Sequence, residues 1–126
     1  MKKERTDTSV FTTYENTVNG IKFVFRIWVL LDEYNSFREI DERYIAFYPC
    51  TTDVNQQEEI TDSFNDYCKE HGIVTCYGEA GDDEDEDDET YISIDIDARD
   101  AADVKRIKQL YDKWRESWKR KNKTIK

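Results

Sequence analysis

The amino-acid sequence predicts a single α+β domain. Its sheet is mainly antiparallel with about five strands, and two helices cover one face, in the order β-β-β-α-β-β-α. Three observations lead to this fold class. An Asn-Gly dipeptide separates two runs rich in β-branched and aromatic residues, two later segments repeat apolar residues at steps of three and four, and one late run alternates strictly. The length of 126 residues fits one domain.

The first two strands are predicted at residues 10–18 and 21–31, joined by a tight turn at Asn19-Gly20. Asn-Gly is the usual pair for a type I′ turn, because both central residues need a positive φ. The odd-numbered residues from Ile21 to Leu31 are all apolar, whereas the even-numbered ones mix charged and apolar types. The second strand is therefore expected to be central, with one face wholly buried.

The connector at 32–43 is charged, and Tyr34, Phe37 and Ile40 lie at helical spacing within it. This spacing predicts a short turn of helix that packs through those three side chains. A third strand is expected at 44–48, ended by Pro49, because proline lacks the N–H that a ladder requires.

The first helix is predicted to begin after Asp53, with Gln56 three residues later completing a capping box. Its inner face is expected to carry Ile60, Phe64, Tyr67, Cys68 and His71, and Gly72 is expected to end it. A structural or capping role is favoured for His71 over catalysis, and Cys68 and Cys76 are expected to be small core residues.

Two more strands are predicted at 73–77 and 90–97, on either side of an acidic loop. In the second of them Ile92, Ile94 and Ile96 should face inward, while the alternate positions should face water: Tyr91, Ser93, Asp95 and Asp97. The last helix should begin at Asp100 and bury one apolar stripe made of Val104, Ile107, Tyr111, Trp114 and Trp118. We expect residues 1–9 to be a flexible segment, 10–118 to be the domain and 119–126 to be a basic tail.

Charge is distributed unevenly along the chain. The formal net charge is −10, yet residues 104–126 hold 10 of the 19 basic residues and only 2 of the 29 acidic ones. An acidic body of this kind repels nucleic acid and membranes and is steered toward basic surfaces. The three cysteines include no Cys-x-x-Cys pair, which favours free thiols in a reducing cytoplasm and predicts no metal site. The longest apolar run is far too short to cross a bilayer, and no cofactor is expected.

The most distinctive stretch is the acidic run at 82–89, which contains only Asp and Glu. Unpaired carboxylates cannot enter a core, so the run must face water or a cationic partner. A calcium loop beginning at Asp83 fails, because Asp88 stands where glycine is needed and Ile94 stands at the twelfth position. The predicted partner-binding residues are the run, one residue before it and two after it: Glu79, Asp82, Asp83, Glu84, Asp85, Glu86, Asp87, Asp88, Glu89, Asp95 and Asp97.

These features lead to the hypothesis of a small acidic binding protein that inhibits or sequesters a basic, nucleic-acid-handling protein, with its carboxylates in place of phosphates. In size and charge, but in no alignable motif, the chain is similar to small phage-encoded inhibitors of restriction or CRISPR enzymes and to immunity proteins that block nuclease toxins. An enzyme is not expected, because an exposed run gives its carboxylates similar pKa values and no nucleophile motif or Gly-rich phosphate loop is present.

Three alternatives remain open. The acidic loop could serve only solubility. The basic C-terminal helix and tail, with Trp114 and Trp118, could associate with RNA or the ribosome. The third alternative is self-association, with the basic end of one copy on the acidic loop of another.

Overall fold

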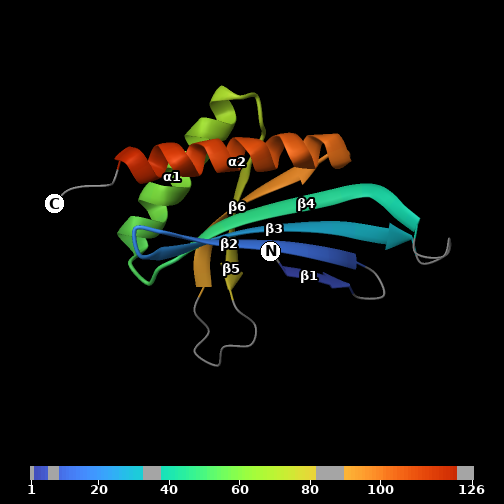
Figure 1. Cartoon of the computed structure of the whole chain (residues 1–126), viewed down its shortest axis with the longest axis horizontal. Coiled ribbons are helices and arrows are strands. Elements are labelled where there is room, and N and C mark those ends of the chain that lie inside the picture. Colours follow the sequence, from blue (N-terminus) through green and yellow to red (C-terminus); the bar gives the residue numbers. More distant parts are fainter. Residues whose placement is uncertain (1, 6–8, 33–37, 82–89, 122–126) are drawn as a thin grey trace.

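The computed structural model describes residues 2–5, 9–32, 38–81 and 90–121. They form one six-stranded antiparallel sheet in the order β1-β2-β3-β4-β6-β5, and both helices lie on the same face of it (Figure 1). The α+β prediction is therefore confirmed, with six strands where about five were expected. The elements are β1 (Lys2–Arg5), β2 (Ser9–Val18), β3 (Ile21–Asp32), β4 (Arg38–Cys50), α1 (Val54–Glu70), β5 (Cys76–Gly81), β6 (Thr90–Ala98) and α2 (Ala101–Lys121).

The first hairpin forms as predicted. Val18 pairs with Ile21, and the turn residues between them, Asn19 and Gly20, have φ values of 52° and 86°. A positive φ is tolerated by Asn and is free of strain in Gly, which explains why this dipeptide stands between two β-rich runs. β3 is central, with Phe23 and Phe25 fully buried on the helix side.

Strand β4 is longer than predicted at both ends. Ile40 belongs to this strand, so the expected helical turn does not form there; Tyr34 and Phe37 lie outside the described residues. Pro49 does not end the strand but pairs with Phe23 of β3. It is tolerated because the ladder between β4 and β6 has already ended at the Phe47–Ile94 pair, which leaves β4 with one neighbour at that point.

Helix α1 begins at the predicted N-cap, but the capping box is only half formed. Asp53 Oδ1 accepts hydrogen bonds from the backbone N–H groups of Asn55 at 3.0 Å and Gln56 at 3.4 Å. The Gln56 side chain does not reach back to the N-cap. Its Oε1 instead accepts from Thr51 Oγ1 at 2.9 Å, and Thr51 Oγ1 itself accepts from the Asp53 N–H. The first turn is thus stabilised by a neighbouring threonine in place of the box.

The end of α1 explains why the next strand starts later than predicted. Gly72 has a φ of 74°, its N–H bonds to Lys69 O, and the Ile73 N–H bonds to Cys68 O, which is a Schellman motif. Ile73 is buried as part of this cap, so β5 begins only at Cys76 and not at Ile73. His71 was predicted on the inner face, but it is exposed; its Nδ1 lies 2.8 Å from Tyr67 O, in keeping with the capping role.

The N-terminal segment and the end of the last helix also differ from expectation. Lys2–Arg5 is not frayed but forms β1, which pairs with β2 at the edge of the sheet. Helix α2 continues to Lys121, three residues into the expected tail. The boundaries of the domain at 10 and 118 stay a prediction.

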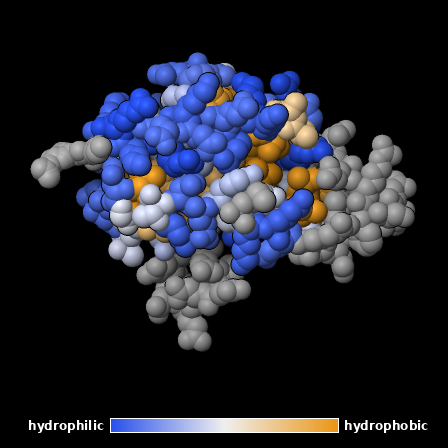
Figure 2. Space-filling model, viewed as in Figure 1, coloured by the Kyte–Doolittle hydropathy of each residue, from blue (hydrophilic) through white to orange (hydrophobic). Residues whose placement is uncertain are grey.

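An aromatic cluster between the sheet and the helices forms the centre of the core. Trp114 of α2 lies with ring centroids 5.7 Å from Phe23, 5.3 Å from Phe47 and 5.1 Å from Phe64. Tyr111 stacks on Phe25 at 4.5 Å. The predicted stripe of α2 is confirmed, because Ile107, Tyr111 and Trp114 are buried while Val104 and Trp118 pack against the core. On the side seen in Figure 2 hydrophilic residues dominate, and hydrophobic ones show only in small separate areas.

Candidate functional site

The predicted partner-binding residues are divided between the two faces of the sheet. Asp95 and Asp97 of β6 are exposed on the face that carries no helix, which we call the open face. Glu79 of β5 pairs with Ile92, so its position belongs to the helix side. Residues 82–89 lie outside the described residues. The residues that flank the acidic run, Gly81 and Thr90, pair with each other at the end of the β5–β6 hairpin.

Asp95 has a defined place on the open face. Its Oδ1 accepts a hydrogen bond from Ser93 Oγ at 3.0 Å. The carboxylate lies over Gly78 of β5, where a Cβ atom would overlap it. Ser93 was predicted to face water, yet it is only 1 % exposed, because this carboxylate and the neighbouring strands cover it. A glycine on β5 is therefore what allows the Asp95 carboxylate to lie against the sheet.

Helix α1 carries a row of carboxylates that the sequence analysis did not single out. Glu58, Asp62, Asp66 and Glu70 follow each other at steps of four and are all exposed. At about 1.5 Å of rise per residue, neighbouring members are about 6 Å apart along the axis and the row spans about 18 Å. Like charges at this spacing destabilise a helix by about 0.2–0.5 kcal/mol per pair. The regular spacing was the signal that could have revealed this row, which we call the α1 acidic row.

The edge strand β5 is attached to the α1 acidic row. The Tyr77 hydroxyl donates a hydrogen bond of 2.7 Å to Asp62 Oδ1. Desolvation of the hydroxyl, together with the nearby Asp62 and Asp66 carboxylates, raises the pKa of Tyr77 to about 12, so it remains a donor at neutral pH. Glu79 follows two residues later on the same side of β5. The α1 acidic row and the helix side of the β5–β6 hairpin therefore form one acidic surface.

A buried glutamine joins α1 to the other strand of this hairpin. Gln57 Nε2 donates to Thr51 O at 2.7 Å, and Gln57 Oε1 accepts from the Ile92 N–H at 3.0 Å. The side chain is 5 % exposed. Ile92 lies beyond the end of the β4–β6 ladder, so this amide supplies an acceptor that the sheet does not provide. Gln57 thus joins α1 to β6 two residues from the loop end of the β5–β6 hairpin.

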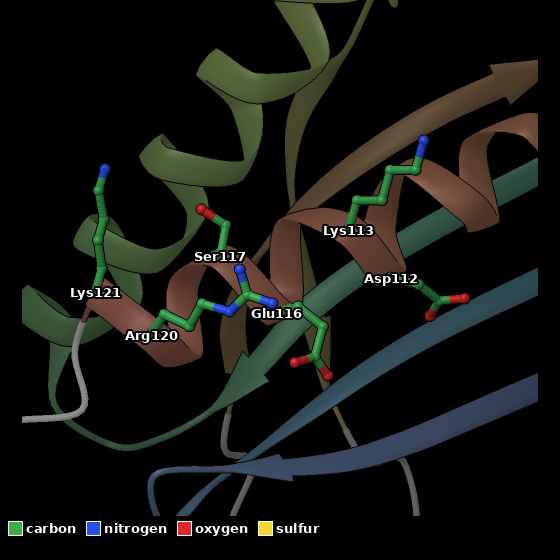
Figure 3. Close-up of a pocket in the computed structure, with 6 residues that line it drawn as sticks. All are labelled: Asp112, Lys113, Glu116, Ser117, Arg120 and Lys121. Atoms are coloured by element: carbon green, nitrogen blue, oxygen red, sulfur yellow. The ribbon is translucent and has the colours of Figure 1, made fainter.

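Basic side chains gather on the second helix, α2. A hollow of about 720 Å³ runs along the C-terminal half of this helix, and in Figure 3 all the side chains that line it come from α2: Asp112, Lys113, Glu116, Ser117, Arg120 and Lys121. Arg115 Nη1 donates to Asn16 Oδ1 of β2 at 3.2 Å and to Asp112 Oδ1 at 2.9 Å. Part of the basic charge of α2 therefore holds the helix to the sheet.

The tryptophans of α2 are occupied by the core. Trp114 is 3 % exposed, and its Nε1 donates to Ser63 Oγ of α1 at 3.1 Å. Trp118 lies 5.8 Å from the Trp114 ring and packs against the same core. Stacking of a nucleic-acid base needs a ring with a free face, and Trp114 does not offer one.

Possible metal ligands and the cysteines are the remaining candidate groups of the described chain. No group of three or more His, Cys, Asp or Glu side chains is placed to hold a metal ion among the described residues. Cys68 is buried, which confirms the core prediction and raises the pKa of its thiol to about 12. Cys76 is exposed, so the core prediction is wrong for that residue; it pairs with Asp95 at the edge of the sheet.

Within the described part of the chain, neither helix is both long and apolar enough to cross a membrane. No protein-family model, no curated protein and no solved structure matches the chain.

Proposed function

We propose that this protein binds a basic, nucleic-acid-handling protein through its acidic surface and thereby inhibits or sequesters that protein. The α1 acidic row carries the proposal: four exposed carboxylates at regular spacing are joined to the β5–β6 hairpin by Tyr77, and the sequence between β5 and β6 is eight consecutive acidic residues. B-DNA carries one charge per about 3.4 Å of each strand, and the α1 acidic row, with one charge per about 6 Å, reaches about half of this linear density, which offers a nuclease or DNA-binding protein a substitute for phosphates.

The segregation of charge supports the same proposal. Helix α1 carries one basic residue in its last turn, Lys69, whereas α2 ends in Lys119, Arg120 and Lys121. A basic partner is thus attracted to α1 and repelled from the C-terminal end of α2, which orients it before contact. The RNA-associated alternative would rely on α2, and the burial of Trp114 removes one of the aromatic rings on which it depends.

The experiment has two stages. Affinity-tagged protein is used to capture partners from the source cell, beside a variant whose residues 82–89 are replaced by the neutral amides. Candidate partners are the proteins retained by the parent and lost by the variant at the same salt concentration. For each candidate we then measure association by stopped flow and its binding to nucleic acid in a competition assay.

The neutralised variant should associate about 10-fold or more slowly, because exposed charges act through steering and raise association rates by about 10–10³-fold. Added salt should slow the parent in the same way, since such charges are screened within about 8 Å at physiological ionic strength. Truncation after Trp118 is the control and should have little effect. If truncation abolishes association while the neutralised variant behaves as the parent, the proposal is refuted in favour of a basic-tail adaptor.

A second variant tests the α1 acidic row by itself. Replacing Glu58 and Glu70 by Gln, and Asp62 and Asp66 by Asn, keeps an acceptor for the Tyr77 hydroxyl. It removes three like-charge pairs and should stabilise the protein by roughly 0.6–1.5 kcal/mol. We expect this variant to be more stable and slower to associate with the partner. Equal association rates for variant and parent would remove the row from the binding surface.

A further inference from the structure

The open face contains a groove with a small residue at its floor. Along β4 the side chains on this face are Tyr44, Ala46 and Tyr48, so two tyrosines stand on either side of an alanine. Residues of β3, β4, β6 and β5 line the groove, which has a volume of about 580 Å³. Ala46 is 7 % exposed and Tyr44 is 37 % exposed. The missing side-chain volume at Ala46 leaves a depression between two aromatic rings.

Aromatic rings and carboxylates surround this depression. Trp28 pairs with Tyr44 on the β3 side, and on the other side Asp95 pairs with Ala46 and Asp97 with Tyr44. Tyr48 is held in place by stacking on Tyr91, with ring centroids 6.0 Å apart and planes 9° from parallel. Rings and carboxylates thus come from neighbouring strands, and their backbone positions are fixed by the sheet.

The charge balance of the groove is negative. Asp95 and Asp97 contribute two carboxylates and Arg26 contributes one guanidinium, whereas the Glu79 side chain belongs to the helix side. Arg26 is partly engaged elsewhere, because its Nε donates to Thr13 Oγ1 of β2 at 3.4 Å. The groove therefore favours a cation over a phosphate. It disfavours a second copy of this chain, which brings a net charge of −10.

We propose that this groove binds an arginine side chain of the basic partner, an inference that rests on the proposed function. A guanidinium is planar and weakly hydrated, stacks on aromatic faces and donates two parallel hydrogen bonds to a carboxylate. Tyr44 and Trp28 supply the aromatic faces, and Asp97 and Asp95 supply the carboxylates. Lysine has the same positive charge but lacks a planar guanidinium with two parallel donors. We therefore expect the groove to bind arginine more tightly than lysine, and the acidic run to bind both equally.

The test compares capped hexa-arginine with capped hexa-lysine by isothermal titration calorimetry in physiological salt. Both peptides should bind the parent, and hexa-arginine should bind about 5-fold more tightly, the order expected from one or two exposed cation–π contacts. Tyr44→Ala should reduce this preference to near unity while leaving the affinity for hexa-lysine almost unchanged. Asp97→Asn should reduce the preference as well. Val74→Ala is the control, because Val74 is also an exposed large side chain but lines neither the groove nor the α1 acidic row.

Each alternative has its own outcome. Equal affinity of the parent for the two peptides, or a preference that survives Tyr44→Ala, overturns the groove assignment alone. Failure of both peptides to bind refutes the proposed function as well. Neutralising residues 82–89 should lower the affinity for both peptides and leave the ratio of the two affinities unchanged. If oligouridylate binds the parent but not Tyr44→Ala, the face binds bases instead; if sedimentation shows self-association that Tyr44→Ala removes, the occupant is a second copy. Either result overturns the inference.

Discussion

Replacing Trp114 by alanine tests the aromatic core and the choice between the functional alternatives. The ring is 3 % exposed and lies within 6.3 Å, between centroids, of Phe23, Phe47, Phe64, Tyr111 and Trp118. Truncating such a buried aromatic residue costs about 3–5 kcal/mol, because transfer energy is lost and a cavity remains. At about 2.1 cal/mol/K per residue, 126 residues give an unfolding entropy near 0.26 kcal/mol/K. The melting temperature should therefore fall by about 11–19 °C.

Thermal unfolding followed by circular dichroism, with urea denaturation at fixed temperature, measures this change. Trp118→Ala is the control: its ring is only partly buried, so the loss should be roughly 1–2 kcal/mol. A cost for Trp114→Ala no larger than that for Trp118→Ala would refute the burial argument. It would also return the α2 tryptophans to the candidates for RNA contact.

Three further predictions concern the turn, the hairpin and alkaline pH. Replacing Asn19-Gly20 by Val-Val should lower the melting temperature, because β-branched residues resist positive φ; an unchanged melting temperature would contradict the turn geometry. Gln57→Leu leaves the Ile92 N–H without its acceptor and should cost about 1–3 kcal/mol in urea denaturation, with faster hydrogen exchange at Ile92; unchanged exchange would count against this contact. Burial raises the pKa of Cys68 from 9.0 and of Tyr111 from 10.0, each to about 12. Their stabilisation should therefore be complete below pH 9 and lost as pH rises toward 12, by up to about 1.4 kcal/mol per pH unit for each group, and Cys68→Ala should flatten the decline between pH 9 and 10.

The candidate site was partly readable from the sequence. The strict alternation of β6 correctly predicted that Asp95 and Asp97 are exposed on one face, because side-chain direction along a strand has a fixed period of two. The α1 acidic row was also present in the sequence, as acids at steps of four. It was not singled out because a charged helix face is usually only solvated, and nothing local shows that Tyr77 joins it to the hairpin.

Local chemistry determined the elements that depend on a few neighbouring residues. The Asn19-Gly20 turn, the Asp53 cap and the buried stripe of α2 follow from φ preferences, side-chain acceptors and helical spacing, all of which act within a few residues. The separation of an acidic body from a basic C-terminal segment is likewise a property of the sequence alone.

The tertiary structure decided whatever depends on strands distant in sequence. Ser93 is buried because Asp95 lies over Gly78 of another strand, and Pro49 is tolerated because β6 has already left β4 at that point. The groove exists because β4 places Ala46 between two tyrosines while β3 and β6 bring Trp28 and the aspartates to its sides. Strand order and register bring these side chains together, and neither is encoded in the spacing of any single segment.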